Sequence, residues 1–183
     1  MATTSGWVLL GLIVGLSVMG LALAGEGGRT FRAGACAVDV MPKKWPVVVS
    51  GGFLEAKAGG PAGTLHARCL VLDDGTTRVA FAVVDTLMMT REFCDEAKEL
   101  ASKATGIPTS HILVSAIHSH SAPSVMGALG TGVQEDYVPV LRDGIVQGIE
   151  QAARNLAPAK VGWTSTIFWR NSSTCEGRTW KEA

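Results

Sequence analysis

The sequence has few aromatic side chains and no excess of charge of either sign. It contains a single tyrosine and 5 phenylalanines, and its 16 basic residues are balanced by 16 acidic ones, giving a formal net charge of +0. No cluster of lysine and arginine alternates with aromatic residues, so the composition argues against a nucleic-acid-binding protein. With 183 residues, 47% of them hydrophobic, the chain is expected to form one globular domain.

Cysteines are also few, and none of them belongs to a Cys-x-x-Cys pair. The 4 cysteines, Cys36, Cys69, Cys94 and Cys175, are widely and irregularly spaced, which argues against a thiolate zinc knuckle. Cys36 and Cys69 lie in apolar runs typical of strands, where a thiol usually serves as a small buried hydrophobe. The spacing therefore favours buried thiols over a disulfide framework, although an even number of cysteines could pair in an oxidising compartment.

A long uncharged run lies near the N-terminus. Residues 7–24, WVLLGLIVGLSVMGLALA, end in Ala22-Leu23-Ala24, which is the small-x-small pattern of a signal-peptide cleavage site. Residues 1–24 are therefore predicted to be a secretory signal peptide, with the domain at 25–183. Because the run approaches the length of a spanning helix and no lysine or arginine precedes it, a retained membrane anchor is the alternative. Both interpretations place the domain outside the cytoplasm, either secreted or periplasmic.

Strand patterns recur along the rest of the chain. The runs LHARCLVL and RVAFAVVD flank Asp73-Asp74-Gly75-Thr76-Thr77, and Asp-Gly supplies the positive φ that a hairpin turn requires. This pattern predicts a β-hairpin. Further strands are predicted in AGACAVDVMP, WPVVVSGGF, HILVSA and AKVGWTSTIFW.

Two amphipathic helices are predicted between these strands. Thr90 can cap the first helix, whose inward face would carry Phe93, Ala97, Leu100, Ala101 and Ala104. Gly106 and the following Pro108 would end it. The second helix is expected from about Gln134 to Asn155, with an inward stripe of Tyr137, Leu141, Ile145, Ile149 and Ala152. Together these elements predict a single α/β domain in which helices flank a mixed β-sheet.

Two of the 4 histidines stand one residue apart. His118 and His120 lie in SAIHSHSAP, directly after a predicted buried strand, and on an extended backbone alternate side chains point the same way. Open α/β sheets bind ligands at the carboxyl ends of their strands. The pair could therefore belong to a zinc-type site with a polar rim, and two solvated loop histidines are the alternative. The residues alone leave both interpretations open.

Asp85 and His66 are further candidates at the same edge of the sheet. Asp85 ends the strand AFAVVD and would either accept a hydrogen bond from a metal-binding imidazole or cap the following turn. His66 lies in TLHARCL and would face either the site or the surface.

The segment IHSHSAP resembles the Thr-His-Thr-His-Ser-Gly-Pro motif of the neutral/alkaline, non-lysosomal ceramidases and their bacterial relatives. The resemblance extends from about residue 33 to residue 163 through four more collinear segments: AGACAVDVMP, LHARCLVLDDGTTRVAFAVVD, TGIPTSHILVSA and IEQAARNLAPAKVGW. In the motif itself, Ile117 and Ser119 replace threonines and Ala122 replaces the glycine. The loss of that glycine removes a residue that favours positive φ or a close ligand approach.

The resemblance implies a zinc amidohydrolase that cleaves the N-acyl bond of ceramide or a related lipid. It also implies that His118 is a Zn²⁺ ligand and that His120 lies in the same active site, where it would orient water, stabilise the oxyanion or shuttle a proton. The partner would be a ceramide-like lipid amide, reached at a membrane surface. The family's remaining ligands, a His, a Glu and a Tyr, are expected beyond residue 183. The chain is thus expected to be the N-terminal portion of a larger ceramidase-type catalytic domain, with one incompletely ligated zinc.

Two other classes stay open. One is a different His-x-His metallohydrolase; a metallo-β-lactamase usually continues with Asp-His, which HSAPSV lacks, and a cyclic amidohydrolase needs the pair at its first strand. The other is an exported non-catalytic domain or defective fragment, which would bind zinc weakly and expose apolar core surface.

Overall fold

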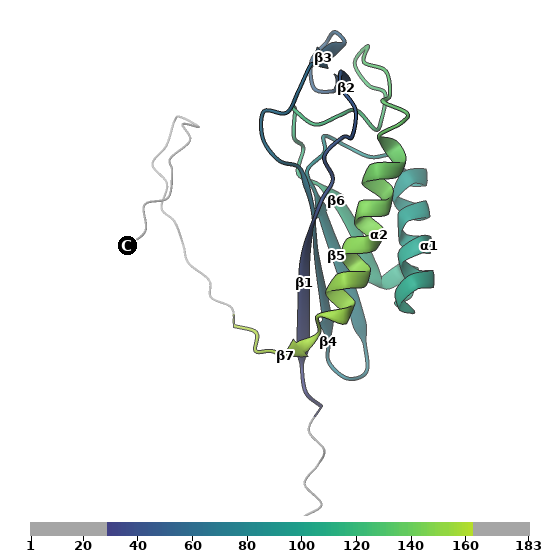
Figure 1. Ribbon diagram of the computed structural model, residues 1–183. Helices are drawn as coiled ribbons and strands as arrows, with labels where there is room; N and C mark the ends of the chain where they lie inside the picture. Colours follow the sequence, from purple (N-terminus) through teal and green to yellow (C-terminus); the bar gives the residue numbers. More distant parts are fainter. Residues whose placement is uncertain (1–28, 163–183) are drawn as a thin grey trace, which may run out of the picture.

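The computed structural model describes residues 29–162, which form a mixed β-sheet with both long helices on one face (Figure 1). The main sheet has five strands in the order β6-β5-β4-β1-β7. These are β1 (Arg32–Asp39), β4 (His66–Asp73), β5 (Arg78–Val84), β6 (Ile112–Ala116) and β7 (Ala157–Pro158). Strands β5 and β6 run parallel, and the other neighbours are antiparallel. The predicted α/β fold with a mixed sheet is confirmed, with the helices on one side of the sheet.

The β4–β5 hairpin forms where the sequence predicts it. Gly75 has φ 85° in the turn, and the Asp74 carboxylate accepts hydrogen bonds from the backbone N–H groups of Thr76 and Thr77. These bonds lower the pKa of Asp74 to about 2. The neighbouring Asp73 carboxylate is buried and accepts hydrogen bonds from the Arg78 guanidinium, which lowers its pKa. The turn residues therefore fix both the hairpin geometry and its local charge pairing.

Helix α1 (Arg91–Thr105) provides the crossover that brings β6 parallel to β5. Its start is capped as predicted, because the Phe93 N–H donates to the Thr90 Oγ1 at 3.1 Å. Its end is also as predicted, with Gly106 in the left-handed conformation at φ 73°. Phe93 and other inward residues are buried, whereas Ala104, predicted to face inward, is exposed. A 3₁₀ turn, η1 (Thr109–His111), then leads into β6.

Helix α2 (Val138–Arg154) packs against β1 and β4 through the predicted apolar stripe, which is buried. The helix begins four residues after Gln134, where the sequence places its start. Gln134 lies instead in the preceding turn, where its side-chain oxygen accepts a hydrogen bond from the Val48 N–H at 2.7 Å. Residues 134–137 therefore connect the helix to the small sheet rather than extending the helix.

A second, two-stranded sheet stands above the main one and consists of β2 (Val47–Val49) and β3 (Ala56–Ala58). The sequence predicts β2 and misses β3. A strand was also predicted within residues 159–169. Its described part, 159–162, has no strand structure, and the rest lies outside the described residues, as does the predicted signal peptide, 1–24.

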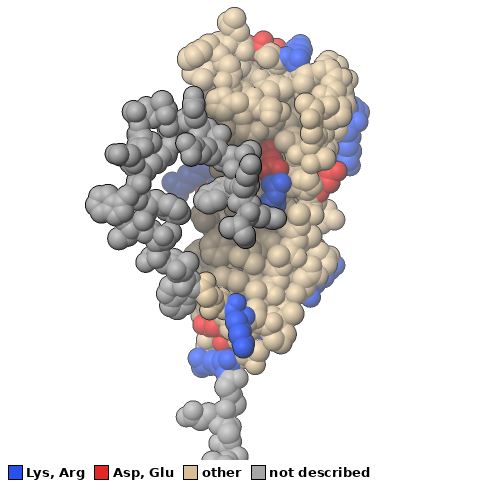
Figure 2. Space-filling view, turned by 90° about the vertical axis from the view of Figure 1, so that its left-hand side faces the viewer, with Lys and Arg blue, Asp and Glu red and all other residues tan. Residues whose placement is uncertain are grey.

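The face of the main sheet opposite the helices is not covered by any described element (Figure 1). Large apolar side chains are exposed there, including Leu70, Val83 and Leu113, at 38%, 40% and 56% exposure. Figure 2 looks toward this side, and charged atoms occupy only a small part of the described surface that it shows. An apolar sheet face of this kind is typical of a surface that packs against another structural layer.

Candidate functional site

The candidate site lies where three strands of the main sheet end. Strands β1, β5 and β6 run in the same direction, because β4 is antiparallel to both β1 and β5 and β6 is parallel to β5. Their carboxyl ends therefore meet at one edge of the sheet, and the loop with His118 and His120 follows β6 there. This is the edge at which open α/β sheets bind ligands.

His118 has an uncommon backbone conformation and an oriented ring. Its φ is 65°, one of two positive values among the non-glycine residues of the described chain, and such conformations concentrate at functional sites. The ring Nδ1 lies 3.2 Å from the Leu87 carbonyl oxygen. If Nδ1 carries the proton and donates it to that carbonyl, Nε2 is left as an unprotonated lone pair, which is the arrangement that a metal-binding histidine requires.

His120 is held in the same way by a different part of the chain. Its Nδ1 lies 3.0 Å from the carbonyl oxygen of Gly51, just after β2. The two imidazole rings are 4.9 Å apart between centroids, edge to face at 77°. The two rings are therefore neighbours, as predicted. The extended backbone predicted for this segment is wrong, because His118 has positive φ and His120 lies in a turn. The positive φ falls on His118, while Ala122, which replaces the motif glycine, is buried.

The two imidazoles are the groups of the described residues that could hold part of a zinc site. Each ring uses Nδ1 toward a backbone carbonyl and leaves Nε2 available, and imidazole is a preferred zinc ligand. Within residues 29–162 no group of three or more His, Cys, Asp or Glu side chains is placed to hold a metal ion. A tetrahedral site would thus need ligands beyond those that this part of the chain supplies.

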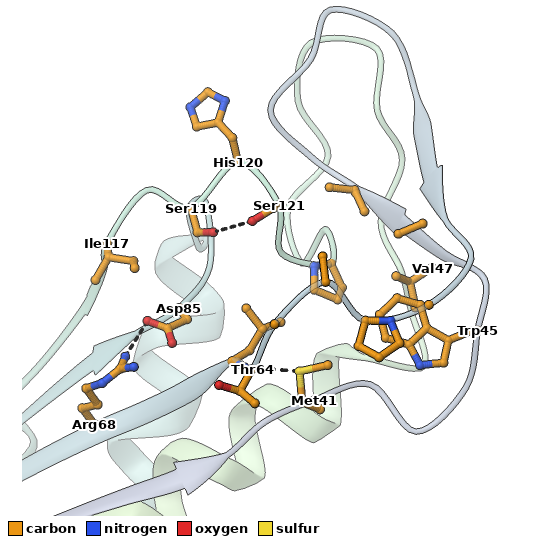
Figure 3. A pocket seen from close by; sticks show the side chains of 18 residues that line it. Met41, Trp45, Val47, Thr64, Arg68, Asp85, Ile117, Ser119, His120 and Ser121 are labelled. Atoms are coloured by element: carbon orange, nitrogen blue, oxygen red, sulfur yellow. Dashed lines mark hydrogen bonds and ion pairs between the residues drawn. The ribbon is translucent and has the colours of Figure 1, made fainter. Parts of the chain in front are cut away.

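A cavity of about 560 Å³ opens beside the histidine loop. Apolar side chains line much of it, among them Met41, Trp45, Val47, Leu65 and Ile117. Polar groups of Ser119, His120, Ser121, Arg68 and Asp85 also line it. In Figure 3 the His120 ring stands at the rim and points away from the group around Trp45 and Val47. His118 does not line this cavity, so of the two histidines only His120 borders it.

Asp85 and Arg68 form an ion pair in the cavity wall (Figure 3). The Arg68 guanidinium donates to Asp85 Oδ1 at 2.6 Å, and the His66 backbone N–H donates to Oδ2 at 2.9 Å. Asp85 is 5% exposed, and its two carboxylate oxygens accept these hydrogen bonds within the protein. Neither predicted role of Asp85 is observed, because its carboxylate bonds to Arg68 and the β4 backbone. His66 is half-buried, with Nδ1 4.0 Å from the Asp85 carboxylate.

Tyr137 adds a buried phenol near these acidic groups. Burial, with Asp85 and Asp39 adding negative charge, raises its pKa above the ordinary range. Among the described residues its hydroxyl has no hydrogen-bond partner. Tyr137 therefore stays neutral at physiological pH and contributes packing in the hydrophobic core, directly before α2.

Sequence reasoning missed the backbone groups that orient the two rings. The Leu87 and Gly51 carbonyls come from segments far from the histidines in the sequence, and backbone acceptors leave no residue-type signal. The glycine pair in WPVVVSGGF could have marked Gly51, because its φ is 121°, a value that residues with a side chain rarely adopt.

We expect Gly51→Ala to displace His120. A Cβ at Gly51 would lie 2.7 Å from the His120 Nδ1 and 2.8 Å from its Cγ, so the ring would have to move and its bond to the Gly51 carbonyl would be lost. Misplacing an active-site group by about 1 Å can cost about 10²-fold in rate. If His120 takes part in hydrolysis, kcat of the native gene product should fall by about 10²-fold.

The matched control for this change is Gly52→Ala. A Cβ there meets nothing closer than the Leu54 carbonyl oxygen at 3.4 Å, so activity should be retained. Unchanged kcat in Gly51→Ala, with a folded protein, would contradict a role for the oriented His120 ring.

The geometry defines an α/β protein with a paired-imidazole site at the carboxyl ends of its strands. Residues 31–174 match the family described as neutral/alkaline non-lysosomal ceramidase, N-terminal. Because this match covers well over half of the 183 residues, the chain belongs to that family, as the motif predicts.

Two solved structures share the fold. A neutral ceramidase from Pseudomonas aeruginosa is 24% identical with a TM-score of 0.62, and a structure described as ceramidase complexed with C2 is 26% identical with the same TM-score. Each alignment covers 70% of this chain and 22% of the other, so the chain spans about a fifth of the length of these ceramidases. No curated protein sequence matches the chain.

Proposed function

We propose that this chain is the N-terminal portion of a zinc-dependent amidohydrolase that cleaves the N-acyl amide bond of ceramide or a related lipid. The observation that carries the proposal is the pair of adjacent imidazoles, His118 and His120, each with Nδ1 directed to a backbone carbonyl, and the cavity that His120 lines. Membership of the ceramidase family supports the reaction type. The same membership favours this reaction over the other His-x-His metallohydrolases.

The two histidines would have different roles. His118 Nε2 would hold the metal, with the Leu87 carbonyl fixing the ring and its tautomer. A bound zinc lowers the pKa of its water and polarises a carbonyl. His120 Nε2 would take a proton from the attacking water and return it to the departing amine, with the Gly51 carbonyl holding the ring in place.

The cavity beside the loop suits one hydrocarbon chain of the substrate. Its apolar residues, such as Trp45, Val47 and Leu65, offer a surface that excludes water from an alkyl chain. The polar groups near Ser119 and Ser121 would face the amide. An amide bond held at the rim would thus lie within reach of His120, and the lipid would reach the site from a membrane surface.

The uncovered sheet face supports the proposal that further polypeptide completes the domain. Leu70, Val83 and Leu113 expose apolar surface on the side opposite the helices. The matched ceramidases are several times longer than the aligned segment. We propose that this face packs against the remainder of a ceramidase-type catalytic domain, which would also supply the remaining zinc ligands.

Export of the protein is part of the proposal. The small-x-small sequence at residues 22–24 supports cleavage of a signal peptide, and an uncleaved segment would anchor the domain to the membrane instead. Within residues 29–162, no helix is both long enough and apolar enough to cross a membrane.

Metal-dependent amide hydrolysis by the native gene product, purified from its host, tests the function. Fatty-acid release from a short-chain ceramide is expected, with loss of nearly all activity after chelation and recovery after adding back Zn²⁺. A product mass above the 19.1 kDa of 183 residues is also expected. Hydrolysis that persists after complete metal removal would contradict zinc dependence.

An exported non-catalytic domain or defective fragment is the second candidate. The described residues supply at most two imidazoles to a metal, which favours weak zinc binding by this part of the chain alone. A metal-replete native product with no amide hydrolysis, or with a mass no greater than 19.1 kDa, would favour this candidate.

A further inference from the structure

Two cysteines lie directly opposite each other on neighbouring strands. In the antiparallel pairing of β1 with β4, Cys36 is the partner of Cys69. Both side chains point to the helix side of the sheet, where Cys69 belongs to the buried core and Cys36 packs against it. The widely spaced cysteines of the sequence are thus adjacent in the fold.

The backbone separation at this pair is compatible with a disulfide. Val40 lies four residues after Cys36, and its register partner Leu65 lies four residues before Cys69. The Val40 N–H donates to the Leu65 carbonyl at 2.9 Å. Because pair types alternate along an antiparallel ladder, Cys36 and Cys69 form a hydrogen-bonded pair, with Cα atoms about 5.5 Å apart. Disulfides span Cα separations of about 4.4 to 6.8 Å, which this pair meets, and Cβ separations of about 3.5 to 4.5 Å. Opposite Cβ atoms in a hydrogen-bonded pair stand farther apart than this, so the bond requires the two side chains to move together.

The surroundings of the two thiols differ. Cys69 is 3% exposed and lies under α2, where a Cβ at Gly148 would be 2.6 Å from its sulfur. Burial raises the pKa of Cys69 to about 12, so its thiol reacts slowly once the helix is in place. Cys36 is half-buried and more accessible, and both cysteines are free thiols in the structure. A bond between them would therefore form most readily before α2 packs onto the sheet.

We propose that Cys36 and Cys69 form a cross-strand disulfide when the chain folds under oxidising conditions. With glutathione disulfide as oxidant, the Cys36 thiolate attacks one of its sulfurs and releases a glutathione thiolate. The Cys69 thiolate then attacks the Cys36 sulfur and releases the second. Two protein thiols thus lose two electrons and two protons, and one glutathione disulfide becomes two glutathione thiols.

The bond would fasten two strands that reach the candidate site. Met41, two residues after β1, and Leu65, just before β4, both line the cavity. The link would close a loop of more than 30 residues that includes the whole β2–β3 sheet. Closing a loop of this size restricts the unfolded chain and stabilises the folded one. The inference is independent of the proposed hydrolase activity.

The experiment is oxidative refolding of the full chain, fully reduced and unfolded, in a glutathione redox buffer, followed by alkylation and tryptic mapping. Trypsin places the four cysteines in separate peptides, 33–43, 69–78, 92–98 and 171–178. The expected product links peptides 33–43 and 69–78, at a yield several-fold above that in urea, where pairing is random. Full alkylation of Cys36 and Cys69, or a predominant link from either to Cys94 or Cys175, would overturn the proposal.

Thermal unfolding gives a second readout. Reduction should lower the Tm of the oxidised protein by about 10 °C. The variant Cys94→Ala, whose thiol lies on α1, should show the same shift. The variants Cys36→Ala and Cys69→Ala should show none, and an equal shift in them would also overturn the proposal.

Discussion

For the proposed zinc amidohydrolase, replacing His118 should lower ceramide hydrolysis by the native gene product by about 10³-fold or more and release the zinc. A metal that activates water and polarises the amide supplies several kcal/mol toward the transition state, and each ~1.4 kcal/mol corresponds to a tenfold change in rate. His118 has a φ of 65°, and its ring contacts the Leu87 carbonyl. The measurement is zinc per chain together with kcat/KM.

Two variants at this position separate loss of the ligand from backbone strain. His118→Ala places a Cβ-bearing residue without a polar side chain at positive φ, whereas His118→Asn tolerates that conformation better. Both should lose zinc to the same extent if the imidazole is the ligand. If His118→Asn retained the zinc content of the wild type, His118 would not be a ligand.

The other histidines provide matched controls. His111 lies at the opposite end of β6, with its Nδ1 3.1 Å from the Arg78 carbonyl oxygen, so His111→Ala should leave zinc and hydrolysis unchanged. His120→Ala should keep the metal and lose hydrolysis, because its proposed role is proton transfer. Loss of zinc in His120→Ala would instead make both imidazoles ligands.

Much of the fold could be predicted because its signals are local. The β4–β5 hairpin follows from Asp-Gly in its turn, and α1 follows from Thr90 at its start and Gly106 at its end. The start of α2 could not be predicted in this way, because Gln134 bonds to the distant Val48. Strand β3 has only three residues and depends on pairing with β2, so its own sequence carries little signal.

The candidate site was predicted in part. The spacing of His118 and His120 and their place after β6 were enough to expect neighbouring rings, and the rings are neighbours. The extended backbone expected at these residues was wrong, since the left-handed conformation of His118 depends on the surrounding loops. The pairing of Asp85 with Arg68 depends on the register between β4 and β5, which residue types alone do not determine.

The second large effect is expected at Gly34, in β1, where the sheet and the end of α2 come closest. A Cβ at this position would overlap the Ala152 carbonyl oxygen and would lie 2.8 Å from the backbone of Asn155 and Leu156. These are backbone atoms in or next to a packed helix, so they cannot move aside as the end of a flexible side chain would. Gly34→Ala must therefore shift α2 away from β1, which opens the contact between helix and sheet along the core.

We expect Gly34→Ala to lower the free energy of unfolding by about 3 kcal/mol, at the upper end of the usual cost of overpacking. Denaturant unfolding measures the change as a lower midpoint with an unchanged m-value. Gly60→Ala is the matched control, because a Cβ there meets nothing within 4 Å, and its free energy of unfolding should stay within about 0.5 kcal/mol of the wild type. Equal midpoints for the two variants would mean that α2 does not lie against β1 at Gly34. A loss of stability in Gly34→Ala but not in Gly60→Ala would show that α2 holds β1 in place, and β1 ends at the edge of the sheet where the two histidines lie.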